Sequence, residues 1–254
     1  MHDEIISALK ELEVRNGCKI LFAAESGSRA WGFASPDSDY DVRAIYVKPL
    51  DWYLSIETAP KDTFEETLPG DLDIVAWELR KTLRLFAGCN LPLCEWLTSP
   101  ILYYAVPGFL EEMLEFLPHA FNPVKATHHY LSLARQSRTT QAEDGTISLK
   151  KLCYLLRGLL AARWCCHFQT MPPVRFLDLL HPEILPDKLL PGIQHLLAQK
   201  HAVCESARQI FPAEMLDFYE VTMQECGRKS AELTPRLLPN VTLDNMLRKW
   251  VRGE

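Results

Sequence analysis

The residues best suited to chemistry lie in one short segment near the N-terminus, where a Gly-Ser pair precedes two aspartates. Ten residues separate Gly27 and Ser28 from Asp39, and Asp41 follows two positions later. Glycine permits a tight turn, and Ser28 is expected to open a short helix whose unpaired backbone N–H groups attract phosphate. Two aspartates spaced by two on a strand point to one face. A divalent cation would relieve their repulsion, so the segment predicts magnesium-dependent chemistry on a phosphate group.

A third carboxylate is expected from a neighbouring strand. Asp73 has apolar neighbours on both sides, as a buried catalytic strand requires, and Asp71 is the alternative because it shares the same face by parity. Three carboxylates can hold two ions about 3.5–4 Å apart, on the attacking and leaving oxygens of an in-line displacement. The predicted metal ligands are therefore Asp39, Asp41 and Asp73, with two Mg²⁺ or Mn²⁺ ions as cofactors.

A P-loop competes for the same glycines, since Gly27 and Gly32 form a G-x-x-x-x-G pattern. Phe33 and Ala34 stand where that motif needs a lysine and a hydroxyl residue to bind phosphate and Mg²⁺. The P-loop interpretation is therefore excluded.

The first half of the chain alternates between strand and helix patterns. Asp3 is a candidate N-cap for the first helix, and Gly17 a candidate stop signal. Between residues 40 and 47, Asp41 and Arg43 alternate with apolar residues, as in a half-buried strand. The predicted elements are helix 3–16, strand 19–24, a turn into a short helix at 25–32, strands 40–47 and 72–79, and helix 80–88.

The second half reads as helical. Beyond about residue 105, apolar residues recur at helical spacing, and prolines punctuate the segments because proline ends helices. The expected helices are 108–117, 124–138, 148–168, 187–210, 213–232 and 242–251. We therefore predict an α+β fold with a mixed sheet in a catalytic domain, residues 1–120, followed by an all-helical nucleotide- or substrate-binding domain, residues 121–254.

Composition is that of an ordinary globular protein, with 254 residues, 48% of them hydrophobic and 24% charged. No apolar run approaches the roughly 20 residues that cross a bilayer, and the acidic N-terminus does not resemble a signal peptide. We expect a cytoplasmic location and no membrane partner. The eight cysteines form no C-x-x-C pair, so buried reduced thiols are expected rather than zinc ligands or disulfides.

The net charge of −6 is unevenly distributed along the chain. Residues 1–124 carry 10 Lys and Arg against 20 Asp and Glu, whereas residues 125–254 carry 17 against 13. An acidic half beside a basic half fits a metal-binding domain joined to one that meets phosphates. Chance drift between two domains would give the same asymmetry, so charge alone does not decide the function.

The Gly-Ser and Asp-x-Asp pattern resembles the shared motif of the DNA polymerase beta superfamily of nucleotidyltransferases. Longer strings resemble its RNA-repair-pathway branch, the RlaP family. These strings are 25–33 (ESGSRAWGF), 38–43 (SDYDVR), 73–81 (DIVAWELRK), 90–92 (NLP), 95–97 (EWL) and 150–157 (KKLCYLLR). The resemblance implies that Asp39 and Asp41 carry metals, that Asp73 completes the catalytic set, and that Gly27, Ser28 and Arg29 bind the triphosphate.

A second group of candidates lies in the predicted helix 148–168. Lys150, Tyr154 and Arg157 are spaced i, i+4 and i+7 and therefore share one helix face, with Lys151 beside them. Such a stripe could stack on a base and bind a triphosphate. Without the family resemblance, a solvated helix face explains the same residues equally well.

We therefore expect a nucleotidyltransferase that binds a nucleoside triphosphate and Mg²⁺ in a cleft between its two domains. An acceptor hydroxyl would attack the α-phosphorus and release pyrophosphate, and RNA is the acceptor that the resemblance favours. Two alternatives keep the fold but change the acceptor, to a protein as in toxin–antitoxin systems or to a small molecule. A third alternative is a non-catalytic nucleotide sensor, which the full set of carboxylates argues against. The sequence predicts neither the preferred base nor the oligomeric state.

Overall fold

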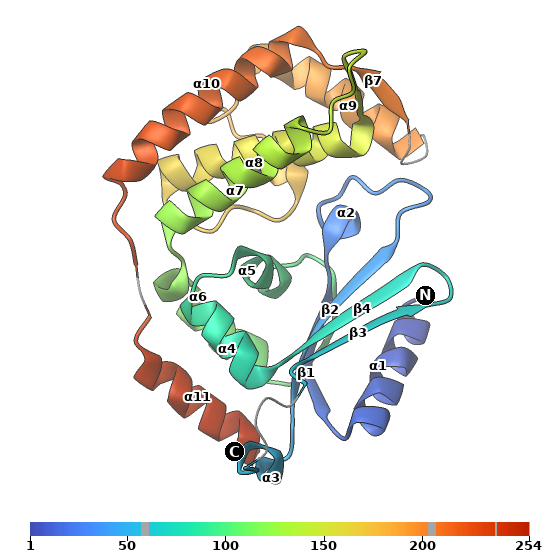
Figure 1. Ribbon diagram of the computed structural model, residues 1–254, viewed down its shortest axis with the longest axis vertical. Coiled ribbons are helices and arrows are strands. Elements are labelled where there is room, and N and C mark those ends of the chain that lie inside the picture. The colour runs from blue at the N-terminus through green and yellow to red at the C-terminus, as the bar shows by residue number, and fades with distance from the viewer. Residues whose placement is uncertain (57–60, 203–206, 237, 254) are drawn as a thin grey trace. The chain divides into compact units, whose positions relative to one another are not determined.

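The computed structural model describes residues 1–56, 61–202, 207–236 and 238–253 (Figure 1). The chain divides into two compact units. The first, called the sheet unit here, comprises Met1–Ala30, Asp39–Ala120 and Leu237–Glu254. The second, called the helical unit, comprises Trp31–Ser38 and Phe121–Arg236. Each unit has its own core and is described separately.

The sheet unit contains one five-stranded mixed sheet, which confirms the predicted α+β class. The strand order is β3-β4-β2-β1-β5. The central strands β2 and β4 run parallel, and the other neighbouring pairs are antiparallel. The strands are β1 (Lys19–Glu25), β2 (Tyr40–Val47), β3 (Thr63–Leu68), β4 (Leu72–Glu78) and β5 (Leu102–Ala105).

The alternation of polar and apolar residues along β2 and β4 decides which face of the sheet is buried under α1 (His2–Asn16). The apolar side chains of that helix pack with Val42 and Ala44 of β2 and Ile74 of β4 in one cluster. Because successive strand residues point to opposite faces, Asp41 and Asp73 belong to the other face. The sheet therefore shows its polar residues on the side away from α1.

The remaining helices of the sheet unit follow the chain around this sheet. Glu78 begins α4 by accepting the N–H groups of Arg80 and Lys81, and Asn90 begins α5 by accepting the N–H of Leu93. These side chains satisfy N–H groups that have no partner within their own helix. The helices are α2 (Gly27–Ala30), α3 (Leu50–Tyr53), α4 (Leu79–Ala87), α5 (Leu91–Leu97), α6 (Phe109–Ala120) and α11 (Asn240–Arg252).

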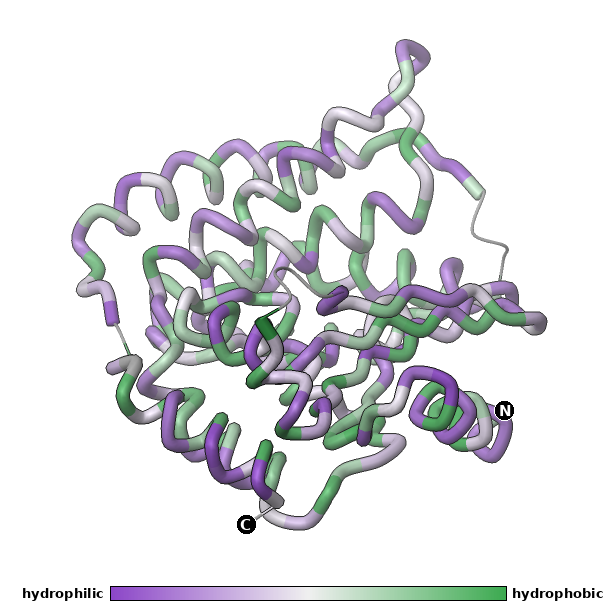
Figure 2. Tube along the Cα trace, turned by 60° about the horizontal axis from the view of Figure 1, so that its bottom comes forward, coloured by the Kyte–Doolittle hydropathy of each residue, from purple (hydrophilic) through white to green (hydrophobic). Residues whose placement is uncertain are grey.

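The helical unit is built around α8, which is buried along most of its length (Figure 1). Gly158 lets α7 approach closely, since a Cβ at that position would lie 2.8 Å from the Tyr130 carbonyl oxygen. In Figure 2 the outer helices alternate between hydrophilic and hydrophobic residues, as helices with one buried face do. The elements are α7 (Pro123–Arg138), α8 (Leu149–Phe168), α9 (Leu190–Ala202), α10 (Ala213–Lys229), strands β6 (Thr146–Ser148) and β7 (Arg208–Ile210), and short 3₁₀ turns at Phe176–Leu179, Asp187–Leu189 and Ser230–Glu232.

Several predicted element boundaries were wrong. Met1 rather than Asp3 is the N-cap of α1, and no side chain caps that helix, whereas Gly17 ends it in the predicted left-handed conformation. Pro118 lies inside the last turn of α6 instead of ending the helix. The single helix predicted at 187–210 is a 3₁₀ turn, α9 and β7, with residues 203–206 outside the described part. Strands β3 and β5 and helix α5 were not predicted.

The loop between α2 and β2 belongs to the helical unit, although both of its ends belong to the sheet unit. Phe33 is fully buried there, and the backbone N–H of Phe176 donates to the Trp31 carbonyl at 2.8 Å. The buried Lys200 of α9 donates to the Ser35 hydroxyl. The middle of the Gly-Ser to Asp-x-Asp motif is thus held by residues of the helical unit.

The described cysteines are free thiols, and most are buried, as expected for reduced cysteines. Cys204 lies outside the described residues. Within the described part of the chain, no helix is both long enough and apolar enough to span a bilayer.

Candidate functional site

Two carboxylates stand side by side on the face of the sheet opposite α1. Asp41 of β2 is the direct register partner of Asp73 of β4, and both side chains are partly exposed. Neighbouring strands lie about 4.8 Å apart, so register partners on one face bring their side chains into contact range. Two of the three predicted catalytic aspartates are therefore adjacent on the sheet.

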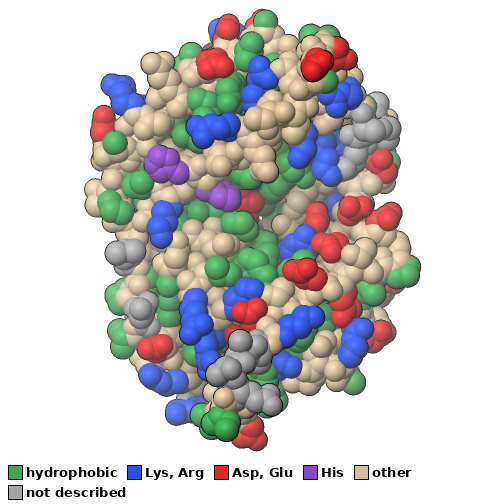
Figure 3. Space-filling model, viewed as in Figure 1, with side chains coloured by type: hydrophobic (Ala, Val, Ile, Leu, Met, Phe, Trp, Pro, Cys, Tyr) green, Lys and Arg blue, Asp and Glu red, His purple; other side chains and the backbone are tan. Residues whose placement is uncertain are grey.

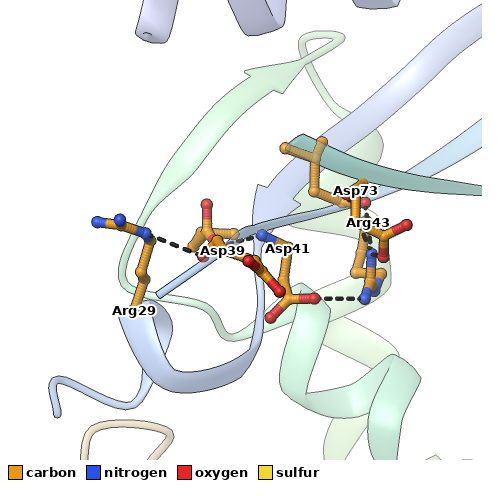
Figure 4. A network of polar contacts seen from close by, with 7 residues as sticks. Arg29, Asp39, Asp41, Arg43 and Asp73 are labelled. Carbon is orange, nitrogen blue, oxygen red and sulfur yellow. Dashed lines mark hydrogen bonds and ion pairs between the residues drawn. The ribbon is translucent and has the colours of Figure 1, made fainter. Parts of the chain in front are cut away.

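An arginine lies between these carboxylates (Figure 4). Arg43 is two residues beyond Asp41 on β2 and so shares its face. Its Nη2 is 2.7 Å from Asp41 Oδ1, and its Nη1 is 2.9 Å from Asp73 Oδ2. Nη1 also donates to the carbonyl oxygens of Val42 and Asp73, at 3.1 and 3.3 Å. One guanidinium thus bridges both strands, and its side chain is only 16% exposed.

A buried glutamate supports the strand that carries Asp41. Glu25 ends β1 with no exposed surface, and its Oε1 accepts the backbone N–H of Asp41 at 2.7 Å. The Tyr103 hydroxyl donates to the other carboxylate oxygen. Burial raises the pKa of the Glu25 carboxyl, and the hydrogen bonds from Tyr103 and Asp41 oppose that rise. Glu25 therefore fixes the backbone of Asp41 rather than offering a solvent-facing ligand.

The predicted glycine turn directly faces Asp41. Gly27 has a φ of +60°, and a Cβ built there would lie 2.1 Å from Asp41 Oδ2. Glycine is required both for the left-handed conformation and for this approach. Oδ2 of Asp41 thus faces the start of the Gly27–Ala30 helix, while Oδ1 contacts Arg43. Ser28 follows in that helix and is 5% exposed.

Arg29 and Asp39 also meet, but through a main-chain atom. The Arg29 Nε donates to the Asp39 carbonyl at 3.0 Å, and its guanidinium lies 3.7 Å from the centre of the Tyr40 ring. Asp39 precedes β2 by one residue and is exposed, so the expectation that it lies on the strand with Asp41 was wrong. Asp71, the alternative third acid, lies in a turn with a φ of +56° rather than on β4.

The residues present suit a divalent cation by the chemistry of their donors. Carboxylate oxygens are the ligands that Mg²⁺ and Mn²⁺ prefer, and Asp41 and Asp73 bring two carboxylates together as register partners. In the described part of the chain, no three His, Cys, Asp or Glu side chains are already gathered as metal ligands. At the aspartate pair, the Arg43 guanidinium contacts both Asp41 and Asp73 (Figure 4).

The four predicted nucleotide-binding residues of the helical unit share α8 but differ in exposure. Lys150, Lys151 and Tyr154 are half-buried, and the Lys151 ammonium lies 5.7 Å from the centre of the Tyr154 ring. Arg157 is 2% exposed, with its guanidinium 4.4 Å from the Trp31 ring centre. Tyr154 meets the same Trp31 ring edge-on at 4.9 Å. Arg157 and Tyr154 therefore contact the motif loop directly.

Two cavities of the sheet unit are lined by neither Asp41 nor Asp73. One, of about 680 Å³, is lined by Lys19, Lys48 and Arg252 among others. The other, of about 910 Å³, adjoins the carboxyl end of β4, where Arg80 and Arg84 stand among acidic residues. Figure 3 shows Lys and Arg side chains gathered on the lower part of the visible face. Neither cavity contains a predicted site residue.

The sequence interpretation did not assign roles to Arg43 and Glu25. Arg43 could have been found, because an opposite charge two residues from Asp41 must lie on the same strand face. Glu25 also carries a signal, since it is the only charged residue between Ile20 and Gly27. What neither signal supplies is the register between β2 and β4, which brings Asp73 to the same guanidinium.

Comparisons with known proteins show which family the chain resembles. The family described as "RNA repair pathway DNA polymerase beta family" matches residues 1–249. The Bacillus subtilis (strain 168) protein named "Uncharacterized protein YcgL" is 43% identical over 200 residues, which are 79% of this chain and 76% of that protein. A nucleotidyltransferase-like protein from Exiguobacterium sibiricum 255-15 matches 91% of this chain and 77% of its own, at 10% identity and a TM-score of 0.35. The match along nearly the whole sequence shows that the chain belongs to the RNA repair pathway DNA polymerase beta family.

Proposed function

We propose that the protein is an active nucleotidyltransferase that moves a nucleoside monophosphate from a triphosphate to an acceptor hydroxyl. The observation that carries this proposal is the placement of Asp41 and Asp73 as register partners, with Asp41 Oδ2 facing the Gly27 turn. Family membership supports the same chemistry. A pair of carboxylates beside a glycine turn suits a polyphosphate and its divalent cation.

The residues predicted from the sequence have these roles in the proposed reaction. The acceptor oxygen forms a bond to the α-phosphorus, and the bond between that phosphorus and pyrophosphate breaks. Asp73 takes the proton of the acceptor hydroxyl, while Ser28 and Arg29 bind the outer phosphates. Asp39, Asp41 and Asp73 would hold the divalent cations, which would neutralise charge that develops on the phosphate oxygens. Catalysis then consists mainly of positioning and charge neutralisation.

We further propose RNA, at its 3′ hydroxyl, as the acceptor. Support comes from the description of the family and from the excess of Lys and Arg in residues 125–254. Binding to RNA phosphates releases counterions, so the affinity should fall steeply as salt rises. The net charge of −6 is compatible with this, because a local basic patch governs the encounter.

The decisive experiment supplies α-labelled nucleoside triphosphates, Mg²⁺ and an RNA with either a free or a blocked 3′ hydroxyl. We expect label on the free RNA alone. Asp41→Asn and Asp73→Asn should abolish labelling, whereas Asp51→Asn, an exposed aspartate on α3, should leave it unchanged. Equal labelling by Asp41→Asn and wild type would refute the site.

The same assay separates the competing functions. A labelled protein band with unlabelled RNA would replace RNA by a protein acceptor. Release of pyrophosphate only in the presence of a small hydroxylated compound would indicate a small-molecule acceptor. Triphosphate binding without pyrophosphate release from any acceptor would leave a nucleotide sensor and refute the enzyme.

A further inference from the structure

Charge is unevenly balanced around Asp41. Glu25, Asp39, Asp41 and Asp73 are the acidic side chains of this region, and only Arg29 and Arg43 oppose them in the contacts described above. The Arg29 Nε donates to the Asp39 carbonyl oxygen, and Arg43 donates to the carboxylates of Asp41 and Asp73. Arg43 thus contacts the carboxylates of both aspartates of the pair directly.

The position of Arg43 follows from the strand geometry. Parallel strands place Asp41 and Asp73 abreast, where two negative charges repel unless a cation joins them. A guanidinium two residues along the same face can reach both, since its planar fork carries several donors in fixed directions. The four acceptors within 3.3 Å of its Nη atoms hold that fork in one place.

We propose that Arg43 is a positioning residue, the resident counter-cation of the Asp41–Asp73 pair, and that it competes with a divalent cation for these carboxylates. This inference rests on the proposed function in one respect, namely that the pair binds metal. A cation bound to only one of the two carboxylates would leave the Arg43 contact with the other in place. A second cation shared by both carboxylates requires the guanidinium to release at least one of them. The first ion should consequently bind more tightly than the second.

The test titrates Mn²⁺ into the full-length protein without nucleotide, following free Mn²⁺ by electron paramagnetic resonance and stability by the melting temperature. Arg43→Met keeps the aliphatic stem and removes the charge. Its metal-free melting temperature should fall, and its Mn²⁺ affinity should rise at least tenfold, with a larger thermal stabilisation by Mn²⁺ than in wild type. Arg43→Lys should return the affinity toward wild type. A purely structural arginine would lower stability without strengthening metal binding.

Arg15→Met is the matched control. Arg15 also belongs to an arginine–carboxylate pair of the sheet unit, with Glu66, but it is not part of the site. The variant changes the net charge equally and should leave Mn²⁺ affinity unchanged. If Arg43→Met does not fold, Arg43→Gln, which keeps hydrogen-bond donors without the charge, serves in the same titration.

The outcomes separate this inference from the proposed function. If Asp41→Asn binds Mn²⁺ as wild type does, the metal site itself is wrong. If Asp41→Asn loses binding but both neutral Arg43 variants bind Mn²⁺ no more tightly than wild type, only the counter-cation role is refuted.

A separate observation concerns two thiols of the helical unit. Cys166 on α8 and Cys226 on α10 lie next to each other, on two helices that contact one another. The Cys166 sulfur is 3.9 Å from the Cys226 carbonyl oxygen and 3.6 Å from the Thr127 hydroxyl. Cys166 is partly exposed and Cys226 is buried.

The surroundings of Cys166 favour its thiolate. The neighbouring Cys226 side chain lowers the pKa of Cys166 to about 7, against the effect of burial, with help from Thr127 and the positive charges of Lys229 and Arg163. The thiolate is the reactive form of cysteine. A partly exposed thiolate beside a second thiol is the arrangement found in peroxide-sensitive cysteine pairs.

We infer that Cys166 and Cys226 form a site of reversible oxidation by a hydroperoxide. The Cys166 thiolate attacks one peroxide oxygen, the O–O bond breaks, and a sulfenic acid and, after protonation, water result. The Cys226 sulfur then attacks the Cys166 sulfur, and a second water leaves as the disulfide forms. In total, two thiols and one hydrogen peroxide give one disulfide and two waters, and the bond ties α8 to α10.

The chain contains a matched control pair. Cys89 and Cys94 of the sheet unit also influence each other, but both are buried, and the pKa of Cys94 is raised by its neighbour and by burial. With hydrogen peroxide and the full-length protein, peptide mass spectrometry should show the Cys166–Cys226 disulfide forming at least tenfold faster than any Cys89–Cys94 disulfide. Cys226→Ser should stop at a sulfenic acid on Cys166 that dimedone traps. Equal rates for the two pairs, or no sulfenic acid in Cys226→Ser, would overturn the inference.

Discussion

Replacing Gly27 by alanine should damage the protein in a way that reveals how Asp41 is held. The substitution imposes two separate costs. Alanine at a φ of +60° is strained by about 1 kcal/mol. In addition, the new Cβ would lie 2.1 Å from Asp41 Oδ2, so that carboxylate must turn away and lose its 2.7 Å contact with Arg43.

Losing a partly buried hydrogen bond between charged groups costs about 1.5–3 kcal/mol, so Gly27→Ala should destabilise the protein by about 3 kcal/mol. Gly17→Ala is the matched control, because Gly17 has a φ of +52° and a Cβ added there would meet nothing within 4 Å. It should lose only the strain of about 1 kcal/mol. At a urea m-value of about 2 kcal/mol/M, the two midpoints should differ by about 1 M. Equal midpoints would show that Asp41 moves without cost and that its position is not fixed by Arg43.

Three further predictions concern the helical unit. Gly158→Ala should lower the stability of the protein despite the better helix propensity of alanine, since its Cβ would lie 2.8 Å from a carbonyl oxygen of α7. Gly227→Ala, which has open space on α10, should raise the stability by up to about 1 kcal/mol in thermal unfolding. A more stable Gly158→Ala than Gly227→Ala would contradict the close packing of α7 and α8. Alkylation of Cys166 by iodoacetamide should accelerate as the pH rises through about 7, and Cys226→Ser should move this inflection upward; an unchanged inflection near 9 in wild type would be contrary to the structure. Lys150→Ala and Lys151→Ala should each weaken triphosphate binding by about 1–3 kcal/mol in calorimetry, and should affect the binding of a monophosphate less. An unaltered triphosphate affinity would show that these lysines only form a solvated helix face.

The parts of the fold that followed from sequence are those with strong local signals. Strand β2 was predicted at its observed bounds, because Asp41 and Arg43 alternate with buried residues. Helix α1 ends at Gly17 as expected, since the left-handed cap favours glycine. Strand β3 was missed because its polar sequence, TFEETL, has only one buried residue and is held by pairing with β4. Short edge strands of this kind depend on tertiary pairing rather than on their own pattern.

The candidate site was predictable in residue type but not in arrangement. Spacing alone placed Asp41 beside a glycine turn, and the structure shows Gly27 in contact range of it. The parallel register that makes Asp73 the neighbour of Asp41 arises from pairing over 32 residues of sequence separation. Asp39 precedes the strand, so its face cannot be derived from strand parity. Arg157 shows the complementary limit, because helix spacing predicts a shared face but not that a Trp31 ring covers it.

The division of the motif between the two units has a consequence for the domain boundary. A cut at residue 120 separates most of the helical unit from residues 1–120, but Trp31–Ser38 would remain attached to the sheet unit. Phe33 would then lose the core that buries it completely, and Ser35 would lose the ammonium of Lys200. Exposing a fully buried phenylalanine costs on the order of 1.5–3 kcal/mol, and the loop also loses the backbone hydrogen bond from Phe176. Because this loop connects Gly27 to Asp41, we expect that residues 1–120 alone would not keep the loop in its present conformation.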